Sequence, residues 1–216
     1  MATASASSNK TNFARLGHAC QDVIPKMWQT ILLFYESPKD IDNDCKNIHL
    51  HDRLSTTESK KIGKAVTDGY SDFDVPLLYT LFKNLISKKQ INSLPSFDDI
   101  NKRYDHPDGP SDTQVTIRDD LERCRRKRNN ILHRGNANIT DQEMANEFKL
   151  FKEIAGRLEI LFNKPNFPQH NFVDEFEKLE TCCMDEETEA NYARNLEILI
   201  KKELDVLDRL ASVEGK

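Results

Sequence analysis

Residues 126–133 read Arg-Lys-Arg-Asn-Asn-Ile-Leu-His, and they end a segment whose apolar positions repeat with the spacing of a buried helix. The steps of three and four residues run through Ile117, Leu121, Cys124 and Ile131. Between the last two of these, Arg128 takes the position where an apolar residue is expected. Because burying an unpaired guanidinium is costly, Arg128 needs a partner, a wet cleft or an interface.

A polar stripe adjoins this seam. Asn129 and His133 are four residues apart and share one face of the helix, and Arg126 is seven residues before His133 on the same face. An arginine, an amide and a histidine within two helical turns are the side chains needed to hold a phosphate and to move a proton beside it.

Local charge supports an anion site. Residues 118–134 contain seven Lys or Arg and three acids, an excess of +4 in a chain of net charge −5. The competing interpretation is structural, since basic residues late in a helix also complement the helix dipole and His133 could simply cap the last carbonyls. Spacing and charge alone leave both interpretations open.

Working outward, the rest of the chain predicts helices. Capping boxes at Ser55–Glu58, Ser111–Gln114 and Thr140–Glu143 each predict a helix start. Asp74 and Pro76 predict another start, and Pro25 should kink or split the first long helix. With no strand-like alternation and only 7 glycines, we expect an all-α, mainly antiparallel helical bundle.

The expected domain organisation has four parts. Residues 1–10 are predicted to be disordered, residues 11–162 to form the bundle and residues 163–171 to form a hinge. Residues 172–216 are predicted to form extra helices that dock on the bundle or pair with a partner helix. Residues 37–54 are expected to be a connection and residues 88–111 a long loop.

Cofactor, metal and membrane sites are not predicted. The five cysteines are odd in number and irregularly spaced, which is typical of reduced thiols in a cytosolic or nuclear protein, and we expect a cytoplasmic one. His49 and His51 are expected to be solvated, because no further metal ligands follow at a fixed spacing. No run of apolar residues is long enough to span a membrane.

The sequence resembles a HEPN domain, a superfamily marked by an Arg, a polar residue and a His with four to six residues between Arg and His. Residues 128–133, Arg-Asn-Asn-Ile-Leu-His, fit with four between. The wider order of segments, from Asn12-Phe13-Ala14-Arg15-Leu16 through Ser71-Asp72-Phe73-Asp74 to Lys83-Asn84-Leu85, is similar to the subfamily found at the N-terminus of DAZ-interacting, RING-type ubiquitin ligases. The resemblance covers about residues 11–162, and no RING finger is present.

This resemblance implies a homodimer through the motif helix, with two motifs building one cleft, and active members are metal-independent endoribonucleases. It assigns His133 as general acid or base, Arg128 as the group that stabilises charge on the phosphate, and Asn129 as the orienting residue. The expected RNA-phosphate contacts are Arg118, Arg125, Arg126, Lys127 and Arg134.

Three functions therefore remain open at this point. The chain is a ribonuclease, a catalytically silent RNA-binding module, or a dimerisation and adaptor module whose C-terminal helices recruit a partner. The arginine-to-histidine spacing is short for this subfamily, and the surrounding residues are unusually basic.

Overall fold

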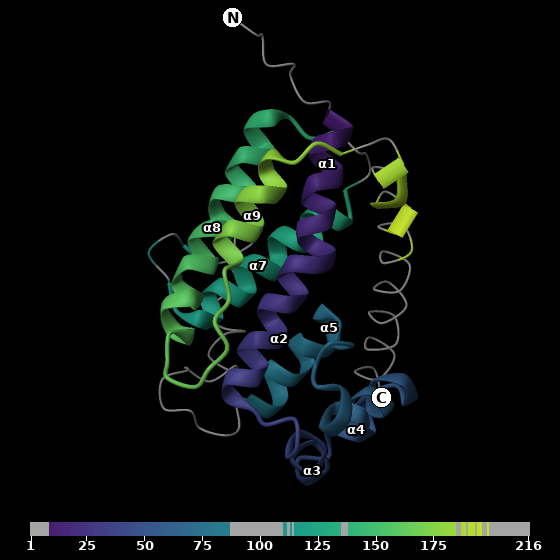
Figure 1. Ribbon diagram of the computed structural model, residues 1–216. Coiled ribbons are helices and arrows are strands. Elements are labelled where there is room, and N and C mark those ends of the chain that lie inside the picture. Colours follow the sequence, from purple (N-terminus) through teal and green to yellow (C-terminus); the bar gives the residue numbers. More distant parts are fainter. Residues whose placement is uncertain are drawn as a thin grey trace, which may run out of the picture. The chain divides into compact units, whose positions relative to one another are not determined.

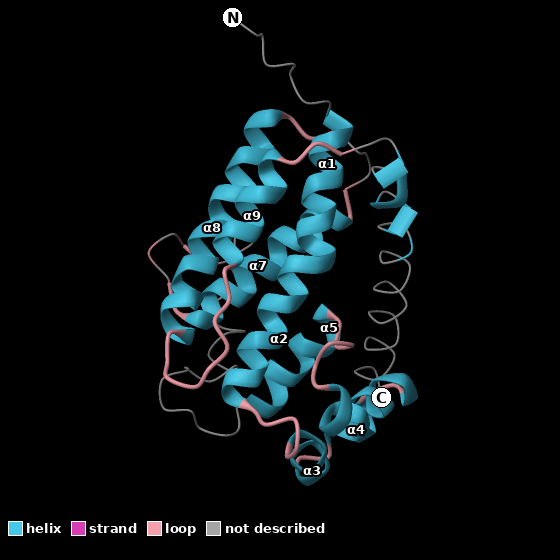
Figure 2. Cartoon of the chain, in the orientation of Figure 1, coloured by secondary structure: helices cyan, strands magenta, loops and turns pink. Residues whose placement is uncertain are grey.

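The computed structural model describes residues 9–86, 110–111, 113, 115–134, 138–184 and scattered positions from 187 to 198. Every element in this part of the chain is helical and none is a strand, which confirms the predicted all-α class (Figures 1 and 2). None of the described helices has the length and apolarity needed to cross a membrane.

The chain divides into two compact units. The first unit comprises residues 1–23, 124–157 and 171–216, and the second comprises residues 24–123 and 158–170. Helix α7, Ile117–Leu132, and helix α8, Asp141–Phe162, each contribute residues to both. Each unit is described by itself below.

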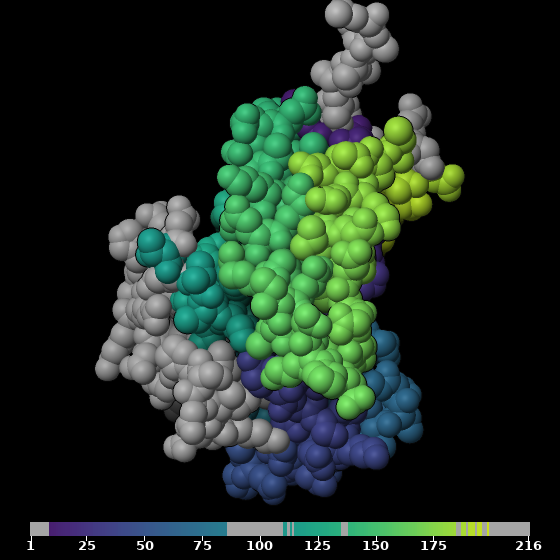
Figure 3. Space-filling model, turned by 60° about the vertical axis from the view of Figure 1, so that its left-hand side comes forward, coloured from purple at the N-terminus to yellow at the C-terminus, as the bar shows by residue number. Residues whose placement is uncertain are grey.

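Aromatic side chains form the core of the first unit. Phe176 of α9, Phe172–Thr181, contacts Phe151 of α8 with ring centroids 5.5 Å apart and Phe148 at 6.4 Å. All three rings are fully buried. Lys152 pairs with Glu180, whereas Gly156 of α8 lies opposite Val173. The two helices are therefore antiparallel, and they lie side by side in Figures 1 and 3.

The core of the second unit is built around Trp28 of α2, Ile24–Tyr35. Its ring lies 6.4 Å from Tyr79 of α5, Val75–Leu81, and 5.9 Å from Phe82, the first residue of a π-helical turn that ends at Ile86. Phe34 contacts Phe162, where α8 ends before Pro165 as predicted. Helix packing by aromatic rings thus defines both cores.

Two helix starts in the second unit follow the predicted capping chemistry. Helix α4, Thr56–Asp68, begins at the Ser55–Glu58 capping box and ends at Gly69, whose φ is 64°. The carboxylate of Asp74 accepts a hydrogen bond from the backbone N–H of Leu77 at the start of α5. These side chains satisfy backbone donors that a helix start otherwise leaves unpaired.

Pro25 is accommodated without a break in helical structure. Helix α1, Asn9–His18, continues through a π-helical turn, Ala19–Val23, into α2, whose second residue is Pro25. Proline lacks an N–H and its ring clashes with the carbonyl four residues earlier. The carbonyl four residues before Pro25 lies within the wider π turn, which makes room for the proline ring. The predicted kink or split is therefore a π turn in a continuous helical segment.

Two predictions about secondary structure are wrong. Residues 37–54 contain helix α3, Ile41–Asn47, and a 3₁₀ turn, Leu50–Arg53, where a connection was expected. Helix α7 begins at Ile117 and not at the predicted Ser111–Gln114 box. The hydroxyl of Thr116 accepts from the N–H of Asp119, and the Asp119 carboxylate accepts from the N–H of Thr116 at 2.9 Å, so this closer pair caps the helix.

Several predictions fall outside the described residues. They concern residues 1–8, most of the loop at 88–111, Gly135 as the end of α7, and most of the helix expected at 187–212. Helix α1 begins at Asn9, two residues before the predicted start of the bundle.

Candidate functional site

Arg128 is buried on the apolar seam of α7, as its position in the sequence predicted. The side chain is 3% exposed, and its neighbours on that seam, Cys124 and Ile131, are also buried. Its Nη1 lies 3.4 Å from the side-chain oxygen of Asn129, which is long for a hydrogen bond. The guanidinium is therefore a largely enclosed charge near the end of the helix.

Asn129 lies in the last turn of α7, and His133 directly follows the helix. The backbone N–H of His133 donates to the carbonyl of Asn129 at 2.8 Å, and His133 is the first residue beyond α7. Asn129 is half-buried, whereas His133 is exposed. An exposed imidazole can exchange protons with a bound molecule, so His133 is the member of the trio that is accessible to a ligand.

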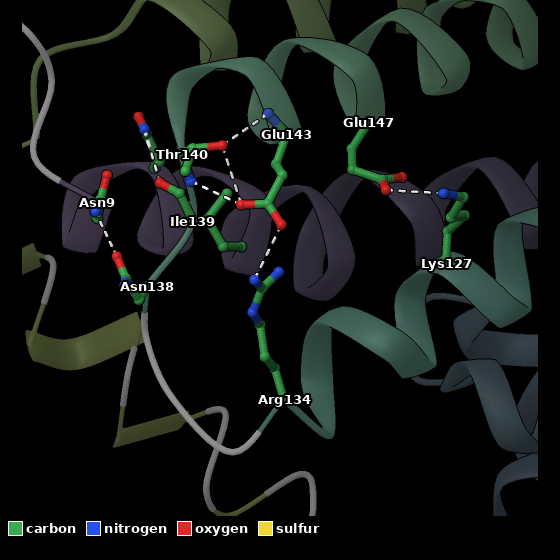
Figure 4. Close-up of polar contacts among 9 residues, drawn as sticks. Asn9, Lys127, Arg134, Asn138, Ile139, Thr140, Glu143 and Glu147 are labelled. Carbon is green, nitrogen blue, oxygen red and sulfur yellow. Dashed lines mark hydrogen bonds and ion pairs between the residues drawn. The ribbon is translucent and has the colours of Figure 1, made fainter.

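Two of the predicted phosphate contacts are engaged by acids of α8 (Figure 4). Lys127 Nζ lies 2.8 Å from Glu147 Oε1, and Arg134 Nη2 lies 3.0 Å from Glu143 Oε1. Glu143 and Glu147 are one turn apart on the face of α8 that meets the end of α7. All four residues belong to the first unit, so this arrangement lies within one compact body.

Glu143 also completes the third predicted capping box. Its carboxylate accepts from the backbone N–H of Thr140 at 2.9 Å, and its own N–H donates to the Thr140 hydroxyl at 3.2 Å. The hydrogen bond from the Thr140 backbone, followed by that from Arg134, lowers the pKa of Glu143 below its ordinary value. The group that faces Arg134 therefore stays ionised further into the acid range than a free glutamate.

The segment before α8 is hydrogen-bonded to α1. The side-chain amide of Asn12, itself fully buried, donates to the carbonyl of Ile139 at 3.1 Å and to the Asp141 carboxylate at 2.7 Å. Asn9 and Asn138 hydrogen-bond through their side chains (Figure 4). These contacts fix the start of α8, and with it Glu143, relative to α1.

The remaining predicted contacts fall into two groups. Arg125 and Arg126 are half-buried on the part of α7 that belongs to the first unit. Arg118 is 3% exposed in the first turn of α7 and belongs to the second unit. Seven of the eight predicted residues therefore belong to the first unit, namely Arg125, Arg126, Lys127, Arg128, Asn129, His133 and Arg134.

Glu143 and Glu147 were not predicted as part of the site. The capping box placed Glu143 at the start of a helix, and Glu147 follows it at the four-residue spacing of one face. The packing of α7 against α8 determines which basic residue Glu143 and Glu147 each contact. The spacing of residues in the sequence does not predict this packing. An acidic pair that follows a basic run across a short loop is the signal that could have indicated the contact.

The described residues contain no group of three or more side chains suited to hold a metal ion. His51 lies 3.2 Å from Asp42, and His49 is exposed with a left-handed backbone, φ 55°. What the arrangement at the end of α7 offers is a cluster of cations beside one exposed imidazole. Side chains of these kinds can bind an anion and can give or take a proton beside it.

A comparison with protein families matches residues 41–192 to the family described as DZIP3/hRUL138-like HEPN. The match includes α7 with residues 128–133 and extends to Tyr192, beyond the predicted end at residue 162, whereas residues 12–16 lie outside it. Searches of curated proteins and of solved structures found no match.

Proposed function

Because this chain belongs to the DZIP3/hRUL138-like HEPN family, we propose that it binds RNA through the C-terminal end of α7. Residues 124–134 contain five Lys or Arg and no acid, in a chain whose net charge is −5. This concentration of cations next to the exposed His133 is the observation that carries the proposal. Phosphates along an RNA strand supply the matching charge.

RNA cleavage is the second candidate, and the exposure of His133 favours it. His133 would take the proton of a 2′-hydroxyl or give one to the leaving oxygen, Asn129 would orient it, and Arg128 would stabilise the charge on the phosphate. Arg128 is only 3% exposed, so its contact with a phosphate needs the end of α7 to open. Binding through the more exposed cations does not need this opening, and it is therefore the function that the geometry supports best.

The test of binding is RNA affinity measured at several salt concentrations. We expect the full chain to bind a labelled single-stranded RNA with an affinity that falls steeply with salt. Arg126→Gln should weaken binding and reduce the slope of log affinity against log salt by about 0.7. Lys39→Gln, the same charge change at an exposed residue of the second unit, should alter neither. A weak, salt-insensitive affinity would overturn the proposal and leave the dimerisation and adaptor module.

Cleavage is tested in the same samples with EDTA present. If His133 transfers a proton, His133→Ala abolishes cleavage while leaving RNA affinity nearly unchanged, and the products of the parent carry 2′,3′-cyclic phosphates. His49→Ala, the same substitution at an exposed histidine of the second unit, is the matched control and should cleave as the parent does. Binding without cleavage by any of them would make this a binding module.

A further inference from the structure

The two ion pairs at the end of α7 share a feature that the RNA proposal does not explain. Both cations are predicted phosphate contacts, and both acids come from consecutive turns of α8. A carboxylate and a phosphate are both oxygen acceptors for an ammonium or a guanidinium, so they compete for the same donors. While Glu143 pairs with Arg134 and Glu147 pairs with Lys127, an RNA phosphate has to displace a carboxylate to bind either cation.

We propose that Glu143 and Glu147 set the affinity of this site for RNA by holding Arg134 and Lys127 in the place of RNA phosphates. The carboxylates release the two cations when RNA binds, and their number and position determine how many phosphates the site engages. This inference rests on the proposed RNA binding and adds the residues that oppose it.

The exposure of the pairs makes this exchange feasible. The side chains of Lys127 and Glu147 are 39% and 21% exposed, and those of Arg134 and Glu143 are 35% and 44% exposed. Ion pairs that solvent reaches in this way are weak, so a phosphate can displace the carboxylate at little cost. Replacing one carboxylate should therefore change RNA affinity by about two- to fivefold rather than by orders of magnitude.

Glu147 is the less well satisfied of the two acids. Its Oε2 is buried and has no hydrogen-bond partner among the described residues, while Oε1 faces Lys127. A carboxylate with one buried oxygen that lacks a hydrogen-bond partner contributes little to the free energy of folding, because its desolvation is only partly compensated. Glu147→Gln removes the charge and should therefore leave the fold intact.

Glutamine is also suitable at the other position. A capping box accepts either Glu or Gln at its last residue, so Glu143→Gln keeps the contact with the Thr140 backbone while losing the charge. The two substitutions preserve length and shape. They remove the charge that competes with phosphates for the cations, and they keep the structural contacts of the same side chains.

The chain offers a matched control. Glu180 of α9 pairs with Lys152 of α8 at 2.6 Å, with side-chain exposures of 23% for Glu180 and 26% for Lys152, within the same unit. Glu180→Gln therefore makes the same change in net charge and breaks an interhelical pair of the same kind. It leaves Lys127 and Arg134 as they are.

The experiment measures the affinity of the full chain for a labelled single-stranded RNA across a salt series, after circular dichroism has shown that every variant melts cooperatively. Glu147→Gln and Glu143→Gln should each tighten binding by about two- to fivefold, and the double variant by about tenfold. Each should steepen the slope of log affinity against log salt by up to about 0.7, because one more cation meets a phosphate. Glu180→Gln should match the parent.

A second substitution tests whether the tighter binding of Glu147→Gln depends on the released Lys127. Lys127→Gln added to Glu147→Gln should return the affinity to that of the parent, because the released cation is then absent. Tightening by Glu180→Gln as large as that by Glu147→Gln would overturn the proposal, since net charge alone would then explain it. So would unchanged affinity in both α8 variants, in which case the pairs serve only to join α7 to α8.

Failure of the underlying RNA binding gives a different result. If the parent and all variants fail to bind RNA, the proposed function is overturned together with this inference. If the parent binds with a steep salt dependence and the α8 variants do not tighten, only this inference is overturned. Binding by the glutamine variants where the parent binds below detection would support both.

Discussion

Arg128 and His133 are five residues apart in the chain and have opposite exposures. Arg128 is 3% exposed on the buried seam of α7, whereas His133 is exposed just after the helix ends. The apolar repeat predicted that Arg128 lies on the buried seam. Helical spacing placed His133 on the face of Asn129 but did not by itself predict how exposed His133 is. Where a helix stops decides how far its last side chains reach into solvent.

Tyr70 gives a residue-scale prediction that involves stability alone. It is 5% exposed, its hydroxyl donates to the carbonyl of Glu36 at 3.1 Å, and its ring lies 5.1 Å from that of Phe73. Tyr70→Phe leaves the Glu36 carbonyl without this donor. We expect a loss of about 1 kcal/mol in the free energy of unfolding at pH 8, measured by urea denaturation.

The same residue predicts how that loss depends on pH. Burial, and then the charge of Glu36, raise the pKa of Tyr70 well above its ordinary value of 10.0. Above pH 10 the unfolded chain loses this proton while the folded chain keeps it, so stability falls as pH rises. At pH 10.5 the parent should lose about 0.8 kcal/mol that Tyr70→Phe does not lose. A difference between the two proteins that stays the same from pH 8 to pH 10.5 would contradict this assignment.

At the scale of elements, the capping box of α4 is the clearest case of sequence chemistry fixing a boundary. The Ser55 hydroxyl accepts from the N–H of Glu58 at 3.2 Å, and the Glu58 carboxylate accepts from the N–H of Ser55 at 2.7 Å. Ser55→Ala should lower the free energy of unfolding by about 1 kcal/mol, measured by urea denaturation. Ser59→Ala, inside the same helix, is the control and should be neutral or slightly stabilising because alanine favours helices. Equal losses in the two variants would show that the cap contributes nothing specific.

The predicted helix starts show what local sequence contains and what it lacks. Ser55–Glu58 and Thr140–Glu143 form the predicted boxes, whereas Ser111–Gln114 does not begin α7. The Thr116–Asp119 pair lies directly before the apolar phase that opens at Ile117, and Asp119 is fully buried. A four-residue pattern therefore predicts a boundary well only where the apolar repeat starts beside it.

Helix α3 was missed for a related reason. Only Ile41 and Cys45, four residues apart, are buried in it, and an Asp42–Lys46 pair lies on its exposed side. Two apolar residues in a stretch rich in Asp and Asn do not establish a helical period. The ion pairs between the end of α7 and α8 were missed because they join residues 20 and 9 positions apart on separate segments, and only tertiary packing decides such partners.

At the scale of the whole molecule, the family match covers residues of both units. It runs from residue 41 to residue 192 and so takes in part of each. Family membership therefore describes the chain as a whole and not one of its units. That α7 pairs with α7 of a second copy is implied by the family resemblance and stays a prediction.

Dimerisation is the prediction that belongs to this scale. Asn130 is the one exposed residue within α7 among those described, so it is the position at which to test a surface that uses this helix. We expect the parent to sediment at micromolar concentration with a mass of about 50 kDa, twice the 24.9 kDa of one chain. Asn130→Arg places two like charges and two long side chains where the copies meet, and it should shift the protein to the monomer.

The control is Asn47→Arg, the same substitution at an exposed position at the end of α3 in the second unit. It should leave the dimer intact, because it changes net charge equally without touching α7. A parent that is a monomer at these concentrations would rule out the composite cleft and would require one chain to bind RNA by itself. A dimer that both variants leave unchanged would place the interface away from Asn130, and Arg128 could then reach a phosphate only through opening of the end of α7.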